Sequence, residues 1–470
     1  MDGLDSVTTY NVVWGVLTSI LTTLGFLLAL MLLSQILRER KPPANSMAWL
    51  ISIVAVPWVA VPMYLLIGKR KLRKFRESRV LEHRRPHKDC DCPDRIILGH
   101  TAEGVFPATC ANRVRLIPDG KQAFEETVDL IRSAQSSIYL ATYIFSADHT
   151  GNLIRDELTA RAKEGLDVCV LVDAYGAMFL SRRYFKPMTD AGGKLGFHGS
   201  VFRLRGKGRT NLRNHRKMII CDGKHAIIGG MNVAEEYMGA HDYDGRWYDL
   251  AAHVDGPAVG DLHDVFLADW KFACDEDLEP FTDTEPAEGA DCDVLAQVIA
   301  SGPDVNGDPL HEALLVSIYA AKNRVWLVTP YFIPDTSLMH ALRIAVRRGV
   351  DVRIITPKKS NHFMADLARA SYLHQLHDEG VKVHQFEAGM LHAKAILIDS
   401  DLTMLGSANM DMRSLFLNFE VTLCSRSETL ADAVAEIMHG LMRFSTDDWP
   451  RRRVVTELFE GVGRLLAPLL

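Results

Sequence analysis

The chain has 470 residues, of which 48% are hydrophobic and 24% are charged, and its formal net charge is −6. This length exceeds what one ordinary hydrophobic core needs, so we expect two or three folding units. An enzyme that grips nucleic acid along its whole surface needs cationic faces, so the negative charge argues against a nucleic-acid partner. The cysteines, of which only Cys90 and Cys92 lie close together, match neither a zinc ribbon nor a disulfide framework, and we expect reduced thiols.

Two long uncharged runs begin the chain, at residues 12–33 and 46–68. Each is long enough to cross a bilayer core of about 30 Å as a helix. We therefore predict that residues 1–70 form a membrane anchor of two hydrophobic segments, with a pair of buried core helices as the alternative. Pro57 and Pro62 interrupt the second run, which must either kink or enter the membrane without crossing it cleanly.

The stretch after the second run is strongly basic, with nine Lys or Arg against two Glu between residues 69 and 85. By the positive-inside rule this flank and the region after it are cytoplasmic, which predicts a multi-pass membrane protein. The connection at residues 38–41 is also basic, so a hairpin that dips into one leaflet is an alternative to two crossings. Residues 71–110 are expected to form a basic flank and linker.

Beyond the linker the chain repeats itself. Each half contains a helical pattern, an apolar run, a second helical pattern and a second apolar run; the runs are 137–145 and 165–172, then 324–332 and 349–356. Apolar runs that alternate with helices are typical of α/β units with buried parallel or mixed sheets. We predict an α/β fold with two pseudo-twofold-related lobes, at 111–285 and 286–470, the second ending in an amphipathic helix.

Within the repeat, five residue types recur at a constant offset of 177 residues. The two copies are His215, Lys217, Asp222, Gly229 and Asn232, then His392, Lys394, Asp399, Gly406 and Asn409. On a strand, a His and a Lys two positions apart point to the same side. Two such strands around a pseudo-twofold axis would place two imidazoles and two ammonium groups around one anionic phosphodiester.

These groups suit phosphodiester chemistry. One neutral imidazole can attack phosphorus and form a phosphohistidine, while the other, protonated, donates to the leaving alkoxide. Lys217, Lys394, Asn232 and Asn409 would hold the non-bridging oxygens and oppose the charge that develops in the transition state. Because two His and two Lys supply the cationic stabilisation, we expect no metal and no other cofactor.

The paired motifs resemble the HxKx4D motifs of the phospholipase D superfamily, over about residues 113–445. The Pro-interrupted segment that runs into residues 64–71 is similar to the N-terminal region of bacterial cardiolipin synthases. The resemblance implies a phosphatidyltransferase of the cell inner membrane, working in anionic lipid. It would pass a phosphatidyl group from one phosphatidylglycerol through His to another, giving cardiolipin and glycerol. A phospholipase D hydrolase, and a transferase that uses phosphatidylethanolamine or free glycerol, remain open, as do the oligomeric state and which His attacks.

The resemblance also implies an acidic partner, downstream of each motif, that fixes the tautomer of the His. Glu420 fits the second His, and Asp249 is the candidate partner of the first. Asp222 and Asp399 are expected to pin the motif strands rather than to take part in the chemistry. For all four acids the alternative is a satisfied turn or ion pair.

Basic residues also lie upstream of the first motif. Arg203, Arg205 and Arg213 are candidates for binding lipid headgroups, and a solvated charged face is the alternative. A nuclease of the superfamily is disfavoured by the two apolar runs and the negative net charge. A non-catalytic membrane scaffold is disfavoured because no motif residue is missing.

Overall fold

The computed structural model describes residues 43–67, 105–199, 212–281, 285–287, 294–305, 307–448 and 460–461, with scattered positions between 14 and 36. These residues belong to two compact units, an N-terminal unit (Met1–Arg70) and a large unit (Lys71–Leu470). Arg203 and Arg205, most of the basic flank and linker, and most of the predicted C-terminal amphipathic helix lie outside the described residues.

The second uncharged run forms two helices instead of one, α2 (Pro43–Ala55) and α3 (Pro57–Ile67). Helical geometry is interrupted at Val56, because a proline disfavours the helical conformation of the residue before it. Pro57 then occupies the first position of α3, where its missing N–H is tolerated, and Pro62 lies inside that helix. The break between α2 and α3 falls directly before Pro57, one of the two prolines that interrupt this run in the sequence.

The sequence predicts two membrane-spanning helices. Within the described residues, no helix combines the length and the apolar composition that a bilayer crossing requires. Most of the first uncharged run lies outside the described residues.

An apolar cluster holds the described part of the N-terminal unit together. Its buried members are Leu32, Ile36, Ile53, Ala60, Val61 and Tyr64. The rings of Trp49 and Tyr64 pack edge to face, with their centroids 5.2 Å apart. Met31 and Val54 are each 75% exposed, so the unit presents apolar side chains on its outside as well.

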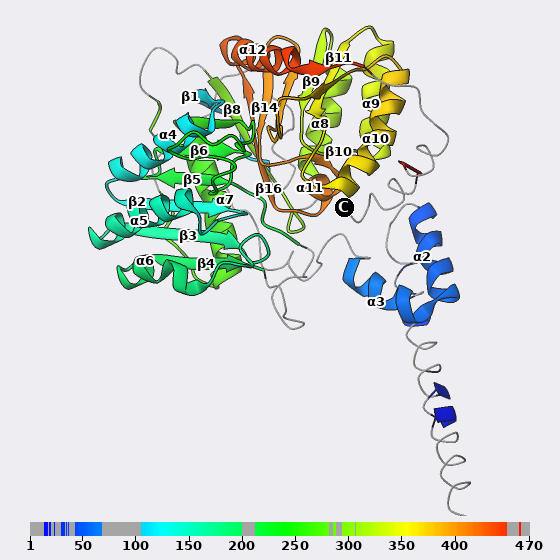
Figure 1. The fold of residues 1–470 in the computed structure, drawn as a ribbon, viewed down its shortest axis with the longest axis horizontal. Helices are drawn as coiled ribbons and strands as arrows, with labels where there is room; N and C mark the ends of the chain where they lie inside the picture. The colour runs from blue at the N-terminus through cyan, green and yellow to red at the C-terminus, as the bar shows by residue number, and fades with distance from the viewer. Residues whose placement is uncertain are drawn as a thin grey trace, which may run out of the picture. The chain divides into compact units, whose positions relative to one another are not determined.

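The large unit is built on one mixed sheet of 15 strands (Figure 1). Seven strands come from its first half: β1 (Thr109–Ile117), β2 (Ser137–Thr142), β3 (Asp167–Asp173), β4 (Lys194–His198), β5 (Met218–Cys221), β6 (His225–Gly229) and β7 (Ala251–Asp255). Eight come from its second half: β8 (Val294–Ser301), β9 (Arg324–Val328), β11 (Asp351–Pro357), β12 (Lys382–Phe386), β13 (Ala395–Ile398), β14 (Leu402–Gly406), β16 (Glu420–Arg426) and β17 (Ser445–Thr446). Two short strands, β10 (Phe332–Ile333) and β15 (Met410–Asp411), pair separately in parallel.

The strand order repeats between the halves. The sheet runs β17-β12-β11-β9-β13-β14-β16-β8-β1-β7-β6-β5-β2-β3-β4, so β1-β7-β6-β5-β2-β3-β4 corresponds strand by strand to β8-β16-β14-β13-β9-β11-β12. The strands β2-β3-β4 and β9-β11-β12 are parallel and the others antiparallel, which confirms the predicted mixed α/β fold. The sequence predicts one sheet in each lobe. In the structure, antiparallel β1 and β8, with Thr109 opposite Ala296, make the sheet continuous.

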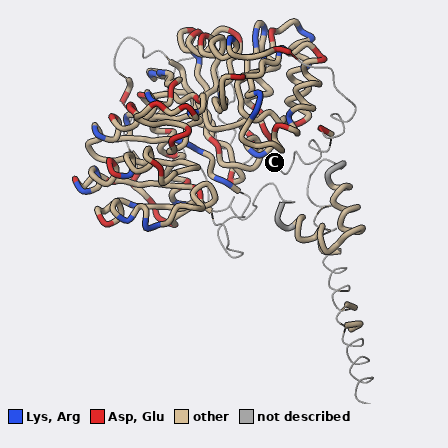
Figure 2. Tube along the Cα trace, viewed as in Figure 1, with Lys and Arg blue, Asp and Glu red and all other residues tan. Residues whose placement is uncertain are grey.

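Helices connect the strands and pack on the sheet. The first half contains α4 (Gly120–Ser133), α5 (His149–Lys163), the short 3-10 helix η1 (Arg182–Phe185), α6 (Lys186–Asp190) and α7 (Ala258–Cys274). The second half contains α8 (Pro309–Ala320), α9 (Thr336–Arg347), α10 (Phe363–Asp378), α11 (Met412–Phe416) and α12 (Glu428–Arg443). Helices α4, α5, α9 and α12 begin at Asp or Ser side chains that accept first-turn N–H groups. Helices α4, α5 and α12 contain charged residues of both signs, whereas the only charged residues of α9 are Arg343 and Arg347 (Figure 2).

The halves share their hydrophobic cores. Val259 and Leu262 of α7 lie in one buried cluster with Val298 of β8 and Leu423 of β16. Helix α12 packs against β1 of the first half as well as β13 and β14 of its own. The predicted lobe boundary near residue 285 falls between α7 and β8.

One cysteine departs from the expectation of reduced thiols. Cys110 is disulfide-bonded, whereas Cys169, Cys221, Cys274 and Cys424 are free. The expectation is therefore wrong for Cys110.

Candidate active site

The two motif strands place their His ends beyond the carboxyl ends of parallel strands. β5 runs antiparallel to β2, with Met218 opposite Ala141, and β13 runs antiparallel to β9, with Ala395 opposite Val328. Each motif His precedes its strand by three residues. Binding sites of α/β sheets commonly form at this edge, because the loops that follow the parallel strands converge there.

Each motif is hydrogen-bonded to the backbone of the other half. The N–H of His215 donates to the carbonyl of Phe419 at 2.9 Å. In the corresponding arrangement, the N–H of His392 donates to the carbonyl of Tyr248 at 2.7 Å. The residue after each of these acceptors is an acid, Glu420 or Asp249. The backbone contacts therefore bring the His of one half beside the acid of the other.

The contacts between the acid and His side chains also cross from one half to the other. Nδ1 of His215 lies 3.0 Å and 3.1 Å from the two carboxylate oxygens of Glu420. Nδ1 of His392 lies 2.5 Å from Oδ2 of Asp249. The sequence assigns Glu420 to the second His and Asp249 to the first, and this pairing is wrong. The acids stand at the starts of β16 and β7, which flank the β8–β1 seam, so each faces the His of the opposite half.

The position after the motif glycine differs between the halves. In the first half it is Gly230, where an added Cβ would lie 2.1 Å from Oδ1 of Asp249. In the second half it is Ser407, whose hydroxyl donates to Oε2 of Glu420 at 2.5 Å and whose carbonyl lies 3.1 Å from Nδ1 of His215. The two acid–His pairs are thus held by different neighbours.

The two lysines are buried beside the imidazoles. Lys217 donates to the carbonyl of His215 at 2.7 Å, and Nζ of Lys394 lies 2.8 Å from Nδ1 of His392. Burial lowers the pKa of Lys217 to about 7, with repulsion from Lys394 adding to the effect and Glu420 opposing it. Burial also lowers the pKa of Lys394 to about 8, against the attraction of Asp249 and Glu420. Nearby anionic phosphate would favour the charged form of both.

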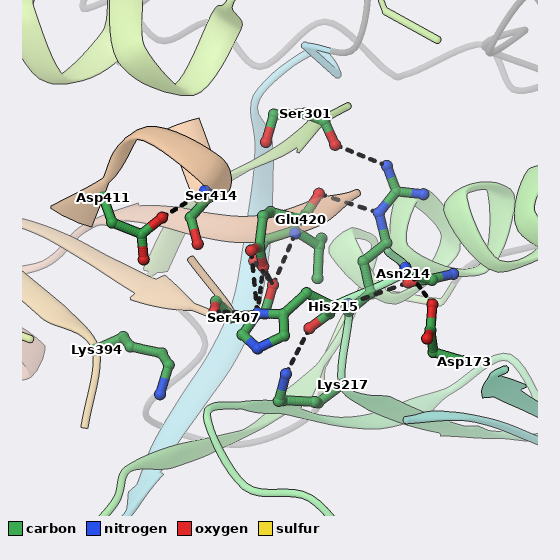
Figure 3. Close-up of polar contacts among 12 residues, drawn as sticks. Asp173, Asn214, His215, Lys217, Ser301, Lys394, Ser407, Asp411, Ser414 and Glu420 are labelled. Carbon is green, nitrogen blue, oxygen red and sulfur yellow. Dashed lines mark hydrogen bonds and ion pairs between the residues drawn. The ribbon is translucent and has the colours of Figure 1, made fainter. Parts of the chain in front are cut away.

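The imidazoles themselves are neutral near pH 7. Burial, together with Lys394, lowers the pKa of His392 to about 3 despite the attraction of Asp249. Burial likewise lowers the pKa of His215, and Glu420 opposes the shift. Lys394 contributes to the lowered pKa of His215, and Lys217 to that of His392, so groups from both halves act on one another electrostatically in a single site. Figure 3 draws His215 and Lys217 of the first half together with Glu420 and Lys394 of the second.

Both acids that contact the imidazoles are ionised. Burial acts to raise the pKa of Glu420, but attraction by His215 and Lys217 outweighs it and the pKa is lowered. For Asp249, Lys394 and His392 outweigh burial in the same way. An ionised carboxylate at Nδ1 favours the tautomer with its proton on Nδ1, which leaves a lone pair on Nε2.

The motif asparagines are buried but differ in their contacts. Oδ1 of Asn232 accepts the N–H of Ile144 at 3.0 Å, so this side chain fixes the segment after β2. Oδ1 of Asn409 is buried and accepts no hydrogen bond from the described residues. Both lie within the motif segment that follows the antiparallel hairpin of their half, β5–β6 or β13–β14.

Asp222 and Asp399 lie at the far ends of the motif strands. Asp222 accepts the N–H groups of Gln135, Ser136 and Ser137 at 2.7–3.0 Å. Asp399 accepts those of Lys322, Asn323 and Arg324 at 2.6–3.2 Å. Both carboxyls thus hold the turn that leads into β2 or β9, and neither touches a motif His.

A buried ion pair at the seam was not anticipated from the sequence. Nη1 of Arg216 lies 2.6 Å from Oδ1 of Asp269 in α7, and both side chains are almost fully buried. Nε of Arg216 donates to the carbonyl of Glu420 at 3.0 Å, and Nη2 donates to that of Ser301 at 3.2 Å. The sequence offered one sign of this ion pair. The residue between the motif His and Lys is Arg216 in the first copy and Ala393 in the second.

Aromatic rings, also missed, pack against both imidazoles. The ring of Tyr143 lies 5.1 Å from that of His215. Tyr237 and Trp247 lie 5.1 Å and 5.2 Å from the ring of His392. These rings restrict the imidazole orientations and exclude water from their faces.

The third predicted headgroup residue, Arg213, stacks its guanidinium over Tyr175 at 4.5 Å. A possible metal-binding group lies elsewhere, at His225, His253 and Asp255, whose potential ligand atoms lie within 4.8 Å of one another. Arg113 lies 3.6 Å from the Asp255 carboxylate, so a cation already neutralises this group. It is not part of the motif site.

Comparisons with known proteins agree with these features. Residues 127–270 and 314–442 match the family described as "Cardiolipin synthase, PLD-like domain", and residues 27–69 match "Phospholipase_D-nuclease N-terminal". The chain is 34% identical to the major cardiolipin synthase ClsA of Bacillus subtilis, covering 97% of this chain and 100% of that one. It is 32% identical to cardiolipin synthase 2 of Bacillus anthracis, covering 92% and 88%. A phosphatidylserine synthase of Haemophilus influenzae shares the fold, with a TM-score of 0.61, 15% identity and coverage of 76% of this chain and 95% of that one.

Proposed function

This chain belongs to the cardiolipin synthases of the phospholipase D superfamily, and we propose that it joins two phosphatidylglycerol molecules through a phosphohistidine on His215 or His392. It is a phosphatidyltransferase that makes cardiolipin. One observation supports the proposed chemistry above all: two acid–His pairs, exchanged between the halves, surround two buried lysines.

In the first step, Nε2 of one imidazole attacks the phosphorus of phosphatidylglycerol. A P–N bond forms, the P–O bond to glycerol breaks, and the other imidazole, protonated in the complex, gives its proton to the glycerol oxygen. In the second step this imidazole takes a proton from a hydroxyl of another phosphatidylglycerol. That oxygen attacks phosphorus and releases the first His. One diester replaces another, so no nucleotide is needed.

The neighbouring groups have distinct proposed roles. Glu420 and Asp249 orient His215 and His392 and stabilise each imidazolium as it forms. Lys217 and Lys394 hold the non-bridging oxygens and become fully charged against them.

The motif asparagines are proposed to assist with the same oxygens. Asn409, whose carbonyl oxygen has no partner among the described residues, is the freer of the two to turn toward a phosphate. Asn232 supports the segment after β2 and contributes through its NH2 group. Asp222 and Asp399 act through the strands they fix.

We also propose that the two uncharged runs attach the enzyme to the inner membrane. The apolar side chains exposed on the N-terminal unit, such as Met31 and Val54, support attachment. The basic stretch at 69–85 favours a cytoplasmic large unit. The disulfide at Cys110 argues for the opposite side, because disulfides persist in oxidising compartments. Labelling of intact cells therefore decides on which side of the membrane the large unit lies.

The test of the activity is incubation of the purified full chain with labelled phosphatidylglycerol, followed by mass analysis of the lipids. Cardiolipin and free glycerol in equal amounts are the expected products. Phosphatidic acid in their place would identify a hydrolase. Cardiolipin that forms only when phosphatidylethanolamine is added would identify a different second substrate.

A further inference from the structure

The most exposed apolar side chains of the large unit lie just beyond two corresponding strands of its sheet. Among its described residues, Phe179 and Phe363 have the highest exposure of any large hydrophobic residue, at 95% and 77%. Phe179 follows β3 and Phe363 follows β11, the strands that correspond in the two halves. Exposure of a phenylalanine after the corresponding strand of each half indicates a shared role for the two side chains.

The loop that carries Phe179 adjoins the active site. Asp173, the last residue of β3, accepts the N–H of Asn214, next to His215, at 2.8 Å. Tyr175, in the same loop, lies under the guanidinium of Arg213. Met178 is 41% exposed beside Phe179, so the outer part of this loop is apolar.

The segment that carries Phe363, the first residue of α10, is linked to the second motif. Asn361 accepts the hydroxyl of Tyr331 at 2.5 Å. The hydroxyl of Thr329 donates to the carbonyl of Tyr331 at 2.9 Å and accepts the N–H of Met410, next to Asn409, at 3.2 Å. Each exposed phenylalanine therefore lies on a segment that is hydrogen-bonded to the surroundings of one motif.

The two loops are basic as well as apolar. Residues 174–185 and 358–363 contain Arg182, Arg183, Lys358 and Lys359 but no Asp or Glu. Lys358 pairs with Glu387 at 2.6 Å, whereas Arg183 and Lys359 form no ion pair within the described part of the chain. Exposed aromatic side chains flanked by free cations are typical of a surface that inserts into anionic lipid headgroups.

We propose that these segments, residues 174–185 and 358–363, form a docking surface that seats the active site on an anionic phospholipid bilayer, with Phe179 and Phe363 inserted. The occupant is a bilayer because the surface combines insertable aromatic rings with positive charge. A site that rests on the bilayer also lets a two-tailed lipid reach His215 or His392 without leaving its membrane completely. This inference rests on the proposed lipid substrate.

The test uses the full chain and compares two forms of phosphatidylglycerol. One is long-chain lipid in vesicles of phosphatidylcholine with phosphatidylglycerol; the other is a short-chain form kept below its micelle concentration. The double variant Phe179→Ser/Phe363→Ser should lose about tenfold or more in kcat/KM on vesicles, since each ring forfeits apolar burial. Its kcat/KM on the monomeric substrate should be unchanged, which also shows that it folds. Tyr319→Ser, an exposed aromatic at the end of α8 that precedes β9, is the matched control and should change neither rate.

A direct contact measurement accompanies the kinetics. A fluorophore attached at Phe179→Cys should be quenched by brominated lipid, and one at Tyr319→Cys should not. The proposal is overturned if the double variant keeps its vesicle rate, or if position 179 is not quenched. A change in oligomeric state without quenching would assign the surface to a second copy of the chain. If wild type makes cardiolipin from neither substrate, the proposed function fails, whatever the quenching shows.

Discussion

Replacing Lys217 by methionine should abolish transfer and yet stabilise the fold. The ammonium is buried, and its pKa falls from 10.5 to about 7. That fall corresponds to about 5 kcal/mol at about 1.36 kcal/mol per pKa unit, and it already includes the attraction of Glu420. Methionine has a similar length and carries no charge to desolvate, so most of this cost should be recovered.

The effect has a defined pH dependence. The folded protein binds this proton less tightly than the unfolded chain, so wild-type stability rises with pH between about 7 and 10.5. The stability gap between Lys217→Met and wild type should therefore be about 5 kcal/mol near pH 6 and about 1 kcal/mol near pH 9.5. Thermal or denaturant unfolding of the detergent-solubilised chain, at both pH values, measures it.

Lys163, exposed at the end of α5, provides the control. Lys163→Met should leave both the activity and the pH dependence of stability unchanged. If Lys217→Met were destabilising at every pH, or if its gap did not shrink as pH rises, Lys217 would not be a strained buried cation. The buried lysine would then not be held ready to gain full charge against an anionic phosphate.

Four further predictions concern the chemistry and the location. His215→Ala and His392→Ala should each remove nearly all transfer, with the double variant hardly worse, because groups that act as a unit are non-additive; near-normal turnover in either single variant would refute a shared site. In double-mutant cycles on stability, Glu420 should couple to His215 by about 0.5–3 kcal/mol and to His392 far less, and the reverse outcome would contradict the exchanged pairing. Transfer should survive exhaustive chelation, so a loss with EDTA that one divalent ion restores would show that the two lysines do not suffice. Asp432→Cys, exposed on α12, should react with an impermeant maleimide only after lysis; labelling in intact cells would invert the proposed orientation and fit the disulfide at Cys110.

Much of the large unit follows from local pattern. The repeated apolar runs predicted the α/β halves, because buried parallel strands read as continuous β-branched segments. The offset of 177 residues reappears in space, since β13 and β14 occupy the places of β5 and β6. The placement of Asp222 and Asp399 also agrees with the expectation that they pin strands, because a carboxyl after a strand can accept the N–H groups of a neighbouring turn.

What the sequence did not reveal depends on contacts between the halves. Nothing in the linear order of residues tells whether Glu420 faces His392, which is nearer in sequence, or His215, which lies 205 positions away. The answer depends on the antiparallel pairing of β1 with β8, which turns β7 and β16 toward opposite halves. The break at Val56 is local by contrast, and its cause, Pro57, was visible in the sequence as an interruption of the apolar run.

The exchange of partners makes the two halves interdependent. Each half supplies one His, one Lys and the acid that orients the other half's His, so neither half alone contains a complete pair. The seam that joins them is therefore part of the site, and the buried Arg216–Asp269 pair fixes it where the backbone of Glu420 begins β16.

The two acid–His pairs also differ in the groups that hold their acids. Glu420 is held by Ser407 and by Arg216, whereas Asp249 sits against Gly230 and accepts the N–H of Leu250 at 2.8 Å. Two-step transfer requires one imidazole to attack while the other moves protons. A strictly symmetric site would give both imidazoles the same basicity. The different supports of the two acids supply the asymmetry that such a division of labour needs.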